Sequence, residues 1–179
     1  MKKTVTFGEL MLRLAPFGYL RFLQEPSFEA TFGGGEANVA VSLANFGVPS
    51  VYVTKLPSND IGLAAVRELK KYGIDTSCIA TGGDRVGIYY LEKGASQRPS
   101  KVIYDRKYSA ISEAKASDFD FDRIFADAGW FHFTGITPAL GGELPTVCEA
   151  ACRAAKAAGA KISCDLNYRK NLWSTDRAR

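Results

Sequence analysis

Short apolar runs alternate with amphipathic stretches along this chain of 179 residues. Four runs have the length of a strand, and each leads into glycine, proline or acidic residues: Val5–Phe7, Val51–Val53, Trp130–Phe133 and Ala160–Cys164. Continuous apolar runs of this kind are typical of strands in a parallel sheet that is covered on both faces.

Helical periodicity fills much of the chain between these runs. Apolar residues recur at spacings of three and four after Glu36, after Asp60 and after Gly142, and a glycine closes each stretch. Because strands and helices alternate, the pattern predicts βαβ units with right-handed crossovers, and therefore an α/β core.

Two segments, about 11–33 and 87–108, depart from this alternation. The first holds two prolines, two glycines and short alternating pieces. The second resembles a hairpin, because residues 87–92 and 102–106 alternate between apolar and polar on either side of a polar loop. Together they predict a small β-sheet lid beside the α/β core.

Polar residues or glycines follow the predicted strands. These clusters are Gly8–Glu9, Pro57–Asp60, Thr134–Thr137 and Asp165–Arg169. Since ligands of open α/β sheets gather at the carboxyl ends of the strands, the clusters predict a site for a polar substrate at this edge. Each cluster alone is equally consistent with loop or helix-cap chemistry.

Three glycines, Gly33, Gly34 and Gly35, precede the predicted helix at Glu36. Glycine lets the backbone approach a ligand closely, and the start of a helix offers free N–H groups. Asn38 lies on the polar side of the first turn and is a second candidate contact. The motif matches neither a dinucleotide fingerprint nor a Walker loop. A tight turn without a ligand remains the alternative.

The predicted hairpin carries Tyr89, Tyr104 and Arg106. Phenol hydroxyls beside a guanidinium suit a sugar acid, because arginine binds a carboxylate through two parallel hydrogen bonds. Arg169 would add a second cation at the same edge. The alternative is cross-strand packing by the tyrosines, with both arginines on the solvated surface.

Charge and composition exclude several classes of protein. The 23 basic and 19 acidic residues leave a net charge of +4, and the basic residues are spread along the chain, so we expect no nucleic-acid partner. The apolar runs are far shorter than the roughly 18 residues of a membrane span, and the start lacks a signal-peptide core. We therefore expect no membrane partner, four reduced and buried cysteines, and a cytoplasmic location.

Other reactive residues do not form a recognisable site. His132 is the single histidine and lies inside an apolar run, which favours a packed core residue. Cys148 and Cys152 are one helical turn apart but have no second pair of ligands. Asp118, Asp120 and Asp122 resemble a solvated helix entry. We expect no metal site and no catalytic triad among these residues.

The sequence resembles the ribokinase-like (PfkB) carbohydrate kinases over the entire chain, and within them the 2-keto-3-deoxygluconate kinases. The resemblance lies in Phe7–Glu9, Gly33–Ala40, Asn59–Gly62, Gly87–Tyr89, Tyr104–Arg106, Phe133–Leu140 and Asp165–Arg169. It implies a doubly wound, mostly parallel sheet with a β-sheet lid, and residues 1–179 would form the N-terminal part of that kinase domain. Lids of this family often pair, which implies a homodimer.

The resemblance also implies an activity and a set of site residues. Family members transfer the γ-phosphate of ATP to a sugar hydroxyl with Mg²⁺. In the keto-deoxygluconate branch the sugar acid would be held by Gly34, Tyr89, Tyr104, Arg106 and Arg169. Asn167 would lie near the phosphates of the nucleotide.

One departure from the family is large. The family's domain extends well beyond the length of this chain, and its Asp-Thr-x-Gly-Ala-Gly-Asp motif does not occur here. That motif supplies the catalytic base, so we expect the base beyond residue 179, no catalytic residue in this chain and little activity from it alone. A fructokinase or ribokinase type of sugar kinase is one alternative. A non-catalytic fragment that binds sugar or dimerises is another.

Overall fold

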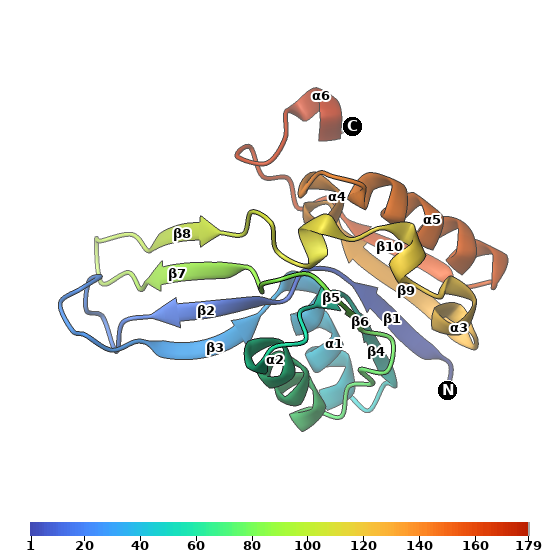
Figure 1. Ribbon diagram of the computed structural model, residues 1–179, viewed down its shortest axis with the longest axis horizontal. Coiled ribbons are helices and arrows are strands. Elements are labelled where there is room, and N and C mark those ends of the chain that lie inside the picture. Colours follow the sequence, from blue (N-terminus) through green and yellow to red (C-terminus); the bar gives the residue numbers. More distant parts are fainter. Residues whose placement is uncertain (179) are drawn as a thin grey trace.

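The computed structural model describes residues 1–178 and contains two four-stranded sheets (Figure 1). Residue 179, the last of the predicted domain segment, lies outside the described residues. The main sheet is parallel throughout and has the order β10-β9-β1-β4. Its strands are β1 (Lys3–Phe7), β4 (Ser50–Val53), β9 (Ala128–Thr134) and β10 (Lys161–Asp165). From β1 the chain first adds β4 on one side and then β9 and β10 on the other side. The strand order therefore switches between β1 and β9, as in a doubly wound fold.

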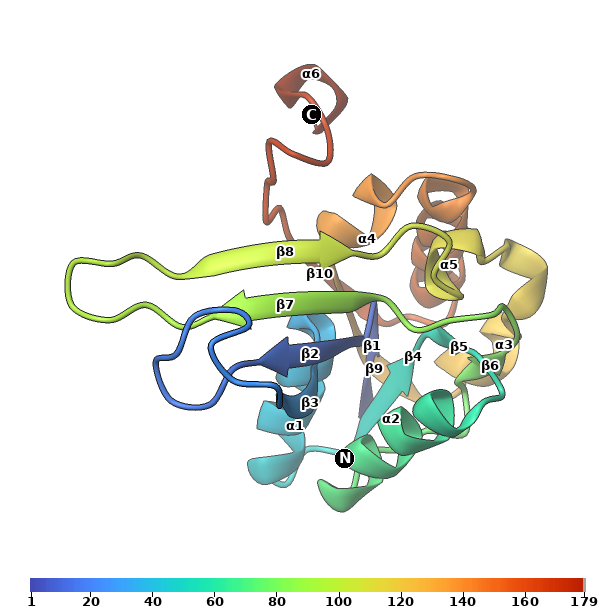
Figure 2. The same ribbon diagram turned by 60° about the vertical axis from the view of Figure 1, so that its left-hand side comes forward.

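Each face of the main sheet carries its own apolar cluster. Val5 and Phe7 of β1 belong to the cluster that holds the buried side chains of α3 (Phe121–Phe125) and α5 (Leu144–Ala157). Tyr52 of β4 belongs to the second cluster, with side chains from α1 (Gly35–Asn45) and α2 (Asp60–Lys71). The four predicted strands and three long helices are therefore all present, with helices on both sides of the sheet (Figure 2).

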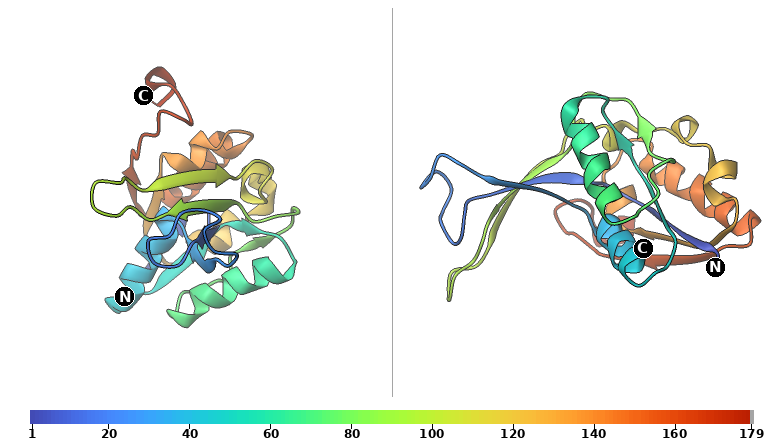
Figure 3. Two further views of the ribbon diagram at one scale, coloured as in Figure 1. Left: turned by 90° about the vertical axis from the view of Figure 1, so that its left-hand side faces the viewer. Right: turned by 90° about the horizontal axis from the view of Figure 1, so that it is seen from below.

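The second sheet projects from the core as a long arm (Figure 3). Its order is β3-β2-β7-β8, with two antiparallel pairs joined by the parallel pair of β2 and β7. The strands are β2 (Met11–Ala15), β3 (Glu29–Gly33), β7 (Ile88–Glu92) and β8 (Lys101–Asp105). They come from the segments 11–33 and 87–108; that this sheet acts as a lid stays a prediction.

The remaining elements are short. They comprise β5 (Lys55–Leu56) and β6 (Ala80–Thr81), which pair in parallel, helices α4 (Ile136–Ala139) and α6 (Thr175–Ala178), and 3₁₀ turns at Ile111–Glu113 and Ala116–Asp118. Pieces of two to four residues leave no periodic pattern, which is why the sequence did not reveal them. Within residues 1–178, no helix combines the length and the apolar character that crossing a membrane requires.

Candidate functional site

The glycine turn joins the second sheet to the main one. Gly33 ends β3, Gly34 precedes α1 in extended backbone, and Gly35 begins the helix. A Cβ atom on Gly34 would overlap the carbonyl oxygen of Glu9, so the two backbones approach more closely here than any larger residue permits. No side chain caps the helix start, which leaves its first N–H groups available to a ligand.

Aromatic and cationic side chains of the second sheet lie over this turn. Tyr89 and Tyr104 face each other across β7 and β8, with ring centroids 6.1 Å apart. The guanidinium carbon of Arg106 lies 4.8 Å from the centroid of the Tyr104 ring. Burial raises the pKa of Tyr89, so its phenol remains a hydrogen-bond donor at neutral pH.

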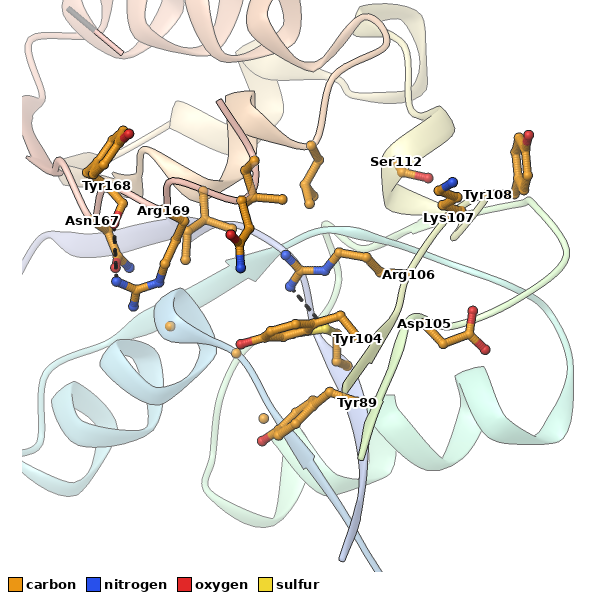
Figure 4. Close-up of a pocket in the computed structure, with 18 of the residues that line it drawn as sticks. Tyr89, Tyr104, Asp105, Arg106, Lys107, Tyr108, Ser112, Asn167, Tyr168 and Arg169 are labelled. Atoms are coloured by element: carbon orange, nitrogen blue, oxygen red, sulfur yellow. Dashed lines mark hydrogen bonds between the residues drawn. The ribbon is translucent and has the colours of Figure 1, made fainter. Parts of the chain in front are cut away.

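The opposite wall follows β10 (Figure 4). Asn167 adopts a left-handed conformation with φ of 42°, and its N–H donates to the Asp165 carboxylate at 3.0 Å. This turn carries the chain to Arg169, whose guanidinium donates to the Tyr168 carbonyl at 3.4 Å. Within residues 1–178, Arg169 forms no ion pair with an acidic side chain, so its charge is available to a ligand.

These walls enclose a cleft of about 1290 Å³. The eight residues that were predicted to bind the substrate or the nucleotide all line it: Gly33, Gly34, Asn38, Tyr89, Tyr104, Arg106, Asn167 and Arg169. Ile136, from the predicted cluster Thr134–Thr137, lines it too, whereas sequence reasoning missed other lining residues, among them Met11, Lys107, Tyr108 and Lys170. The two lysines could have been found from the sequence, because Lys107 directly follows Arg106 and Lys170 directly follows Arg169.

Two buried carboxylates hold the walls in place. Glu9, which follows β1, forms an ion pair with Arg106 at 2.9 Å. Glu36, on the first turn of α1, accepts hydrogen bonds from the Thr134 N–H and the Thr137 hydroxyl, both at 3.0 Å. Glu36 therefore ties the glycine turn to the end of β9.

The Glu36 contact predicts a loss of stability on truncation. We expect Glu36→Ala to lower the free energy of unfolding by about 3 kcal/mol, because two buried donors lose their acceptor. Glu36→Gln keeps an acceptor oxygen and is expected to cost about 1 kcal/mol. Urea unfolding of both variants measures the difference, and equal losses would contradict the proposed role of the two hydrogen bonds.

Comparison with known proteins places the chain in a family. The sequence model that describes the pfkB family carbohydrate kinases matches residues 1–179 of this chain. The chain belongs to the PfkB family. A 2-dehydro-3-deoxygalactonokinase of Haloferax volcanii is 38% identical over 98% of this chain and 55% of the relative.

Solved structures of sugar kinases agree with the fold. The 2-dehydro-3-deoxygluconokinase of Thermotoga maritima superimposes with a TM-score of 0.97 at 56% identity, over 99% of this chain and 54% of that one. An uncharacterized sugar kinase from Pyrococcus horikoshii in complex with ATP superimposes with a TM-score of 0.83 at 25% identity, over 97% of this chain and 56% of that one. This PfkB chain thus spans about half the length of the relatives it matches, and the predicted ribokinase-like α/β fold is confirmed.

Some predicted positions of the PfkB chain fall outside the cleft. The cluster Pro57–Asp60 is absent from its lining, because Asn59 serves as the cap of α2 and accepts the Gly62 N–H at 3.0 Å. His132, which the sequence favoured as a packed core residue and not as a site residue, is outside as well; it is half-buried, and its Nδ1 lies 3.1 Å from the Ser163 hydroxyl. The three aspartates do not act as one group, since Asp118 pairs with Lys55 at 2.8 Å and Asp120 caps α3.

The cysteines correct one expectation. All four are unpaired, as predicted, but only Cys148 is fully buried, and Cys164 is exposed. The reason is that β10 is the edge strand of the main sheet, and its residues remain largely uncovered within the described chain. Burial raises the pKa of the Cys148 thiol, which makes it unreactive at neutral pH.

Proposed function

We propose that the whole protein transfers the γ-phosphate of ATP to a hydroxyl of a sugar acid resembling 2-keto-3-deoxygluconate. The observation that carries this proposal is the convergence of two arginines and two tyrosines on the glycine turn in one cleft. A neutral sugar gives the Arg169 guanidinium nothing to neutralise, whereas a carboxylate does, and Arg106, although paired with Glu9, also lines the cleft. The Haloferax and Thermotoga relatives are a 2-dehydro-3-deoxygalactonokinase and a 2-dehydro-3-deoxygluconokinase, which supports the same substrate class.

In this proposal each residue has a separate task. Arg106 and Arg169 bind the carboxylate from opposite walls. Tyr89 and Tyr104 donate to sugar hydroxyls, and Asn38, with the backbone at Gly33 and Gly34, fixes the remaining ones. Asn167 lies near the phosphates of the nucleotide. These contacts position the acceptor hydroxyl, and positioning is the main protein contribution to phosphoryl transfer.

ATP is the proposed phosphate donor, and the ATP complex of the Pyrococcus relative supports it. Mg²⁺ accompanies ATP in this proposal. Within residues 1–178, no group of three or more His, Cys, Asp or Glu side chains could hold a metal ion, so we assign no step of this chain to Mg²⁺. The catalytic base is likewise proposed to lie beyond residue 179, and the location to be the cytoplasm.

A substrate panel tests the proposal. ADP release by the whole protein is measured with 2-keto-3-deoxygluconate, its galactose-derived epimer, fructose, ribose and a nucleoside. We expect the highest kcat/KM for a sugar acid. A preference for a neutral sugar would instead support a fructokinase or ribokinase type of enzyme and would leave Arg106 without a ligand.

The lack of a base within these residues gives a non-catalytic function as the second candidate. Calorimetric titration of the 179-residue chain with the sugar acid and with ATP discriminates between the two. Binding of the sugar acid without ATP, together with an inactive whole protein, would support a sugar-binding role.

Exposed apolar side chains of the second sheet support a homodimer. They include Tyr19, Leu20 and Leu23 in the loop before β3, and Val102 and Ile103 on β8. Leu23 is 86% exposed. Because a second copy of this arm would cover them, we propose that the whole protein dimerises through the lid; sedimentation of a monomer at micromolar concentration would contradict this.

A further inference from the structure

Glu9 occupies the junction between the two sheets. It lies between the end of β1 and the start of β2, and it is 4% exposed. Its Oε2 lies 2.9 Å from Nη2 of Arg106, and its Oε1 accepts a hydrogen bond from the Ser109 hydroxyl at 3.2 Å. Both partners belong to the segment that follows β8, so one carboxylate binds the returning end of the second sheet to the core.

The structure keeps space for this carboxylate. A Cβ atom on Gly87 would lie 2.5 Å from Glu9 Oε1, so only glycine fits before β7 while Glu9 holds its position. Burial raises the pKa of Glu9, and the charge of Arg106 opposes that rise. A carboxylate this deeply buried is stable only with a cation and hydrogen-bond donors beside it.

The same contacts restrict Arg106 from several sides. Besides Glu9, its Nη2 contacts the Met11 sulfur at 3.1 Å, and the Tyr104 ring lies against the guanidinium. The side chain is only 15% exposed, yet it lines the cleft (Figure 4). Its buried Nε has no hydrogen-bond partner among residues 1–178, and the same holds for Oε2 of Glu9, so the Glu9–Arg106 contact is an ion pair rather than a hydrogen bond.

We propose that Glu9 is a positioning residue that holds the Arg106 guanidinium in the orientation that binds the substrate carboxylate. The inference rests on the proposed function, since it needs an anionic substrate. An arginine side chain has many rotamers, and ordering it before binding removes part of the entropic cost of binding. Arg169, which has no such acidic partner within the described residues 1–178, does not gain this advantage.

Glu9→Gln tests the proposal in the whole protein, because glutamine keeps the shape and removes the charge. We expect KM for the sugar acid to rise about 10-fold, with kcat and KM for ATP unchanged. In an Arg106→Ala background the same substitution should change KM less than about 2-fold, because the residue it positions is gone. An equal effect of Glu9→Gln in both backgrounds would overturn the proposal.

A matched control separates charge removal in general from this contact. Glu92 is also buried and pairs with an arginine, Arg98, at 3.3 Å, but neither residue lines the cleft. Glu92→Gln should therefore leave KM for the sugar acid unchanged. If Glu9→Gln does not fold, Ser109→Ala replaces it, and we expect about a 3-fold rise in KM; an unchanged KM would then count against the proposal.

A second readout does not depend on catalysis. Nitrogen-15 relaxation of the Arg106 Nε–H group is expected to show a rigid side chain without ligand, and order parameters below about 0.6 in Glu9→Gln. A whole protein that does not phosphorylate sugar acids would end the proposed function, while this measurement would still decide what Glu9 does. Equal Arg106 mobility in both proteins would end the present inference.

Discussion

Arg106→Ala is expected to raise KM of the whole protein for a sugar acid about 100-fold, which corresponds to about 2.7 kcal/mol. The reason is that the guanidinium is largely buried at the cleft wall, where its hydrogen bonds to a carboxylate are little screened by water. Arg169→Ala is expected to raise KM about 10-fold, because Arg169 is exposed and its charge is screened. Steady-state kinetics with varied sugar acid measures both effects.

The design of this experiment requires two controls. Arg153 forms an exposed pair with Glu149 on α5, and neither residue lines the cleft, so Arg153→Ala should leave KM unchanged. Thermal unfolding of Arg106→Ala is also needed, because the substitution leaves Glu9 buried without its cation. Unchanged affinity for the sugar acid in both Arg106→Ala and Arg169→Ala would exclude the carboxylate assignment.

The fold was predictable wherever burial produces a pattern in the sequence. Val5 and Phe7 face one apolar cluster while Thr4 and Thr6 point to the other face, and the run Val51–Val53 lies beside them in register. The hairpin within 87–108 also followed from alternation, whereas its register, which places Tyr89 opposite Tyr104, comes from the structure. Such positions are fixed by contacts that repeat every two residues, and a single sequence displays them.

The site was predictable only in part, because its pairings join residues far apart in the chain. Glu9 was recognisable as a polar residue after a strand, but nothing in the sequence indicates that Arg106 neutralises it. Pro57–Asp60 had the same kind of signal and became a helix cap instead, since Asn59 is followed directly by α2. Polar residues after strands therefore indicate the edge of the sheet at which a ligand site can form, and tertiary packing decides which of these residues lie together.

Gly34→Ala tests how closely the glycine turn must approach the core. The backbone of Gly34 is extended, so alanine has no conformational strain there, but its Cβ atom would overlap the carbonyl oxygen of Glu9. Because a backbone oxygen cannot rotate away, the turn must shift. We expect a loss of about 3 kcal/mol in unfolding free energy. We also expect kcat/KM for the sugar to fall about 100-fold, since displacements near 1 Å have effects of that size.

Gly35→Ala provides a matched control for stability one residue further on. A Cβ atom on Gly35 would meet only a methyl carbon of Thr134, at 3.8 Å, and alanine favours the helix that begins there. Its free energy of unfolding should be unchanged or about 0.5 kcal/mol higher. Urea unfolding is measured for both variants, and kinetics for Gly34→Ala. The difference in stability between the variants separates the close approach of Gly34 to Glu9 from the general effect of adding a methyl group. If both variants are equally stable, the contact between Gly34 and Glu9 does not determine the position of the turn.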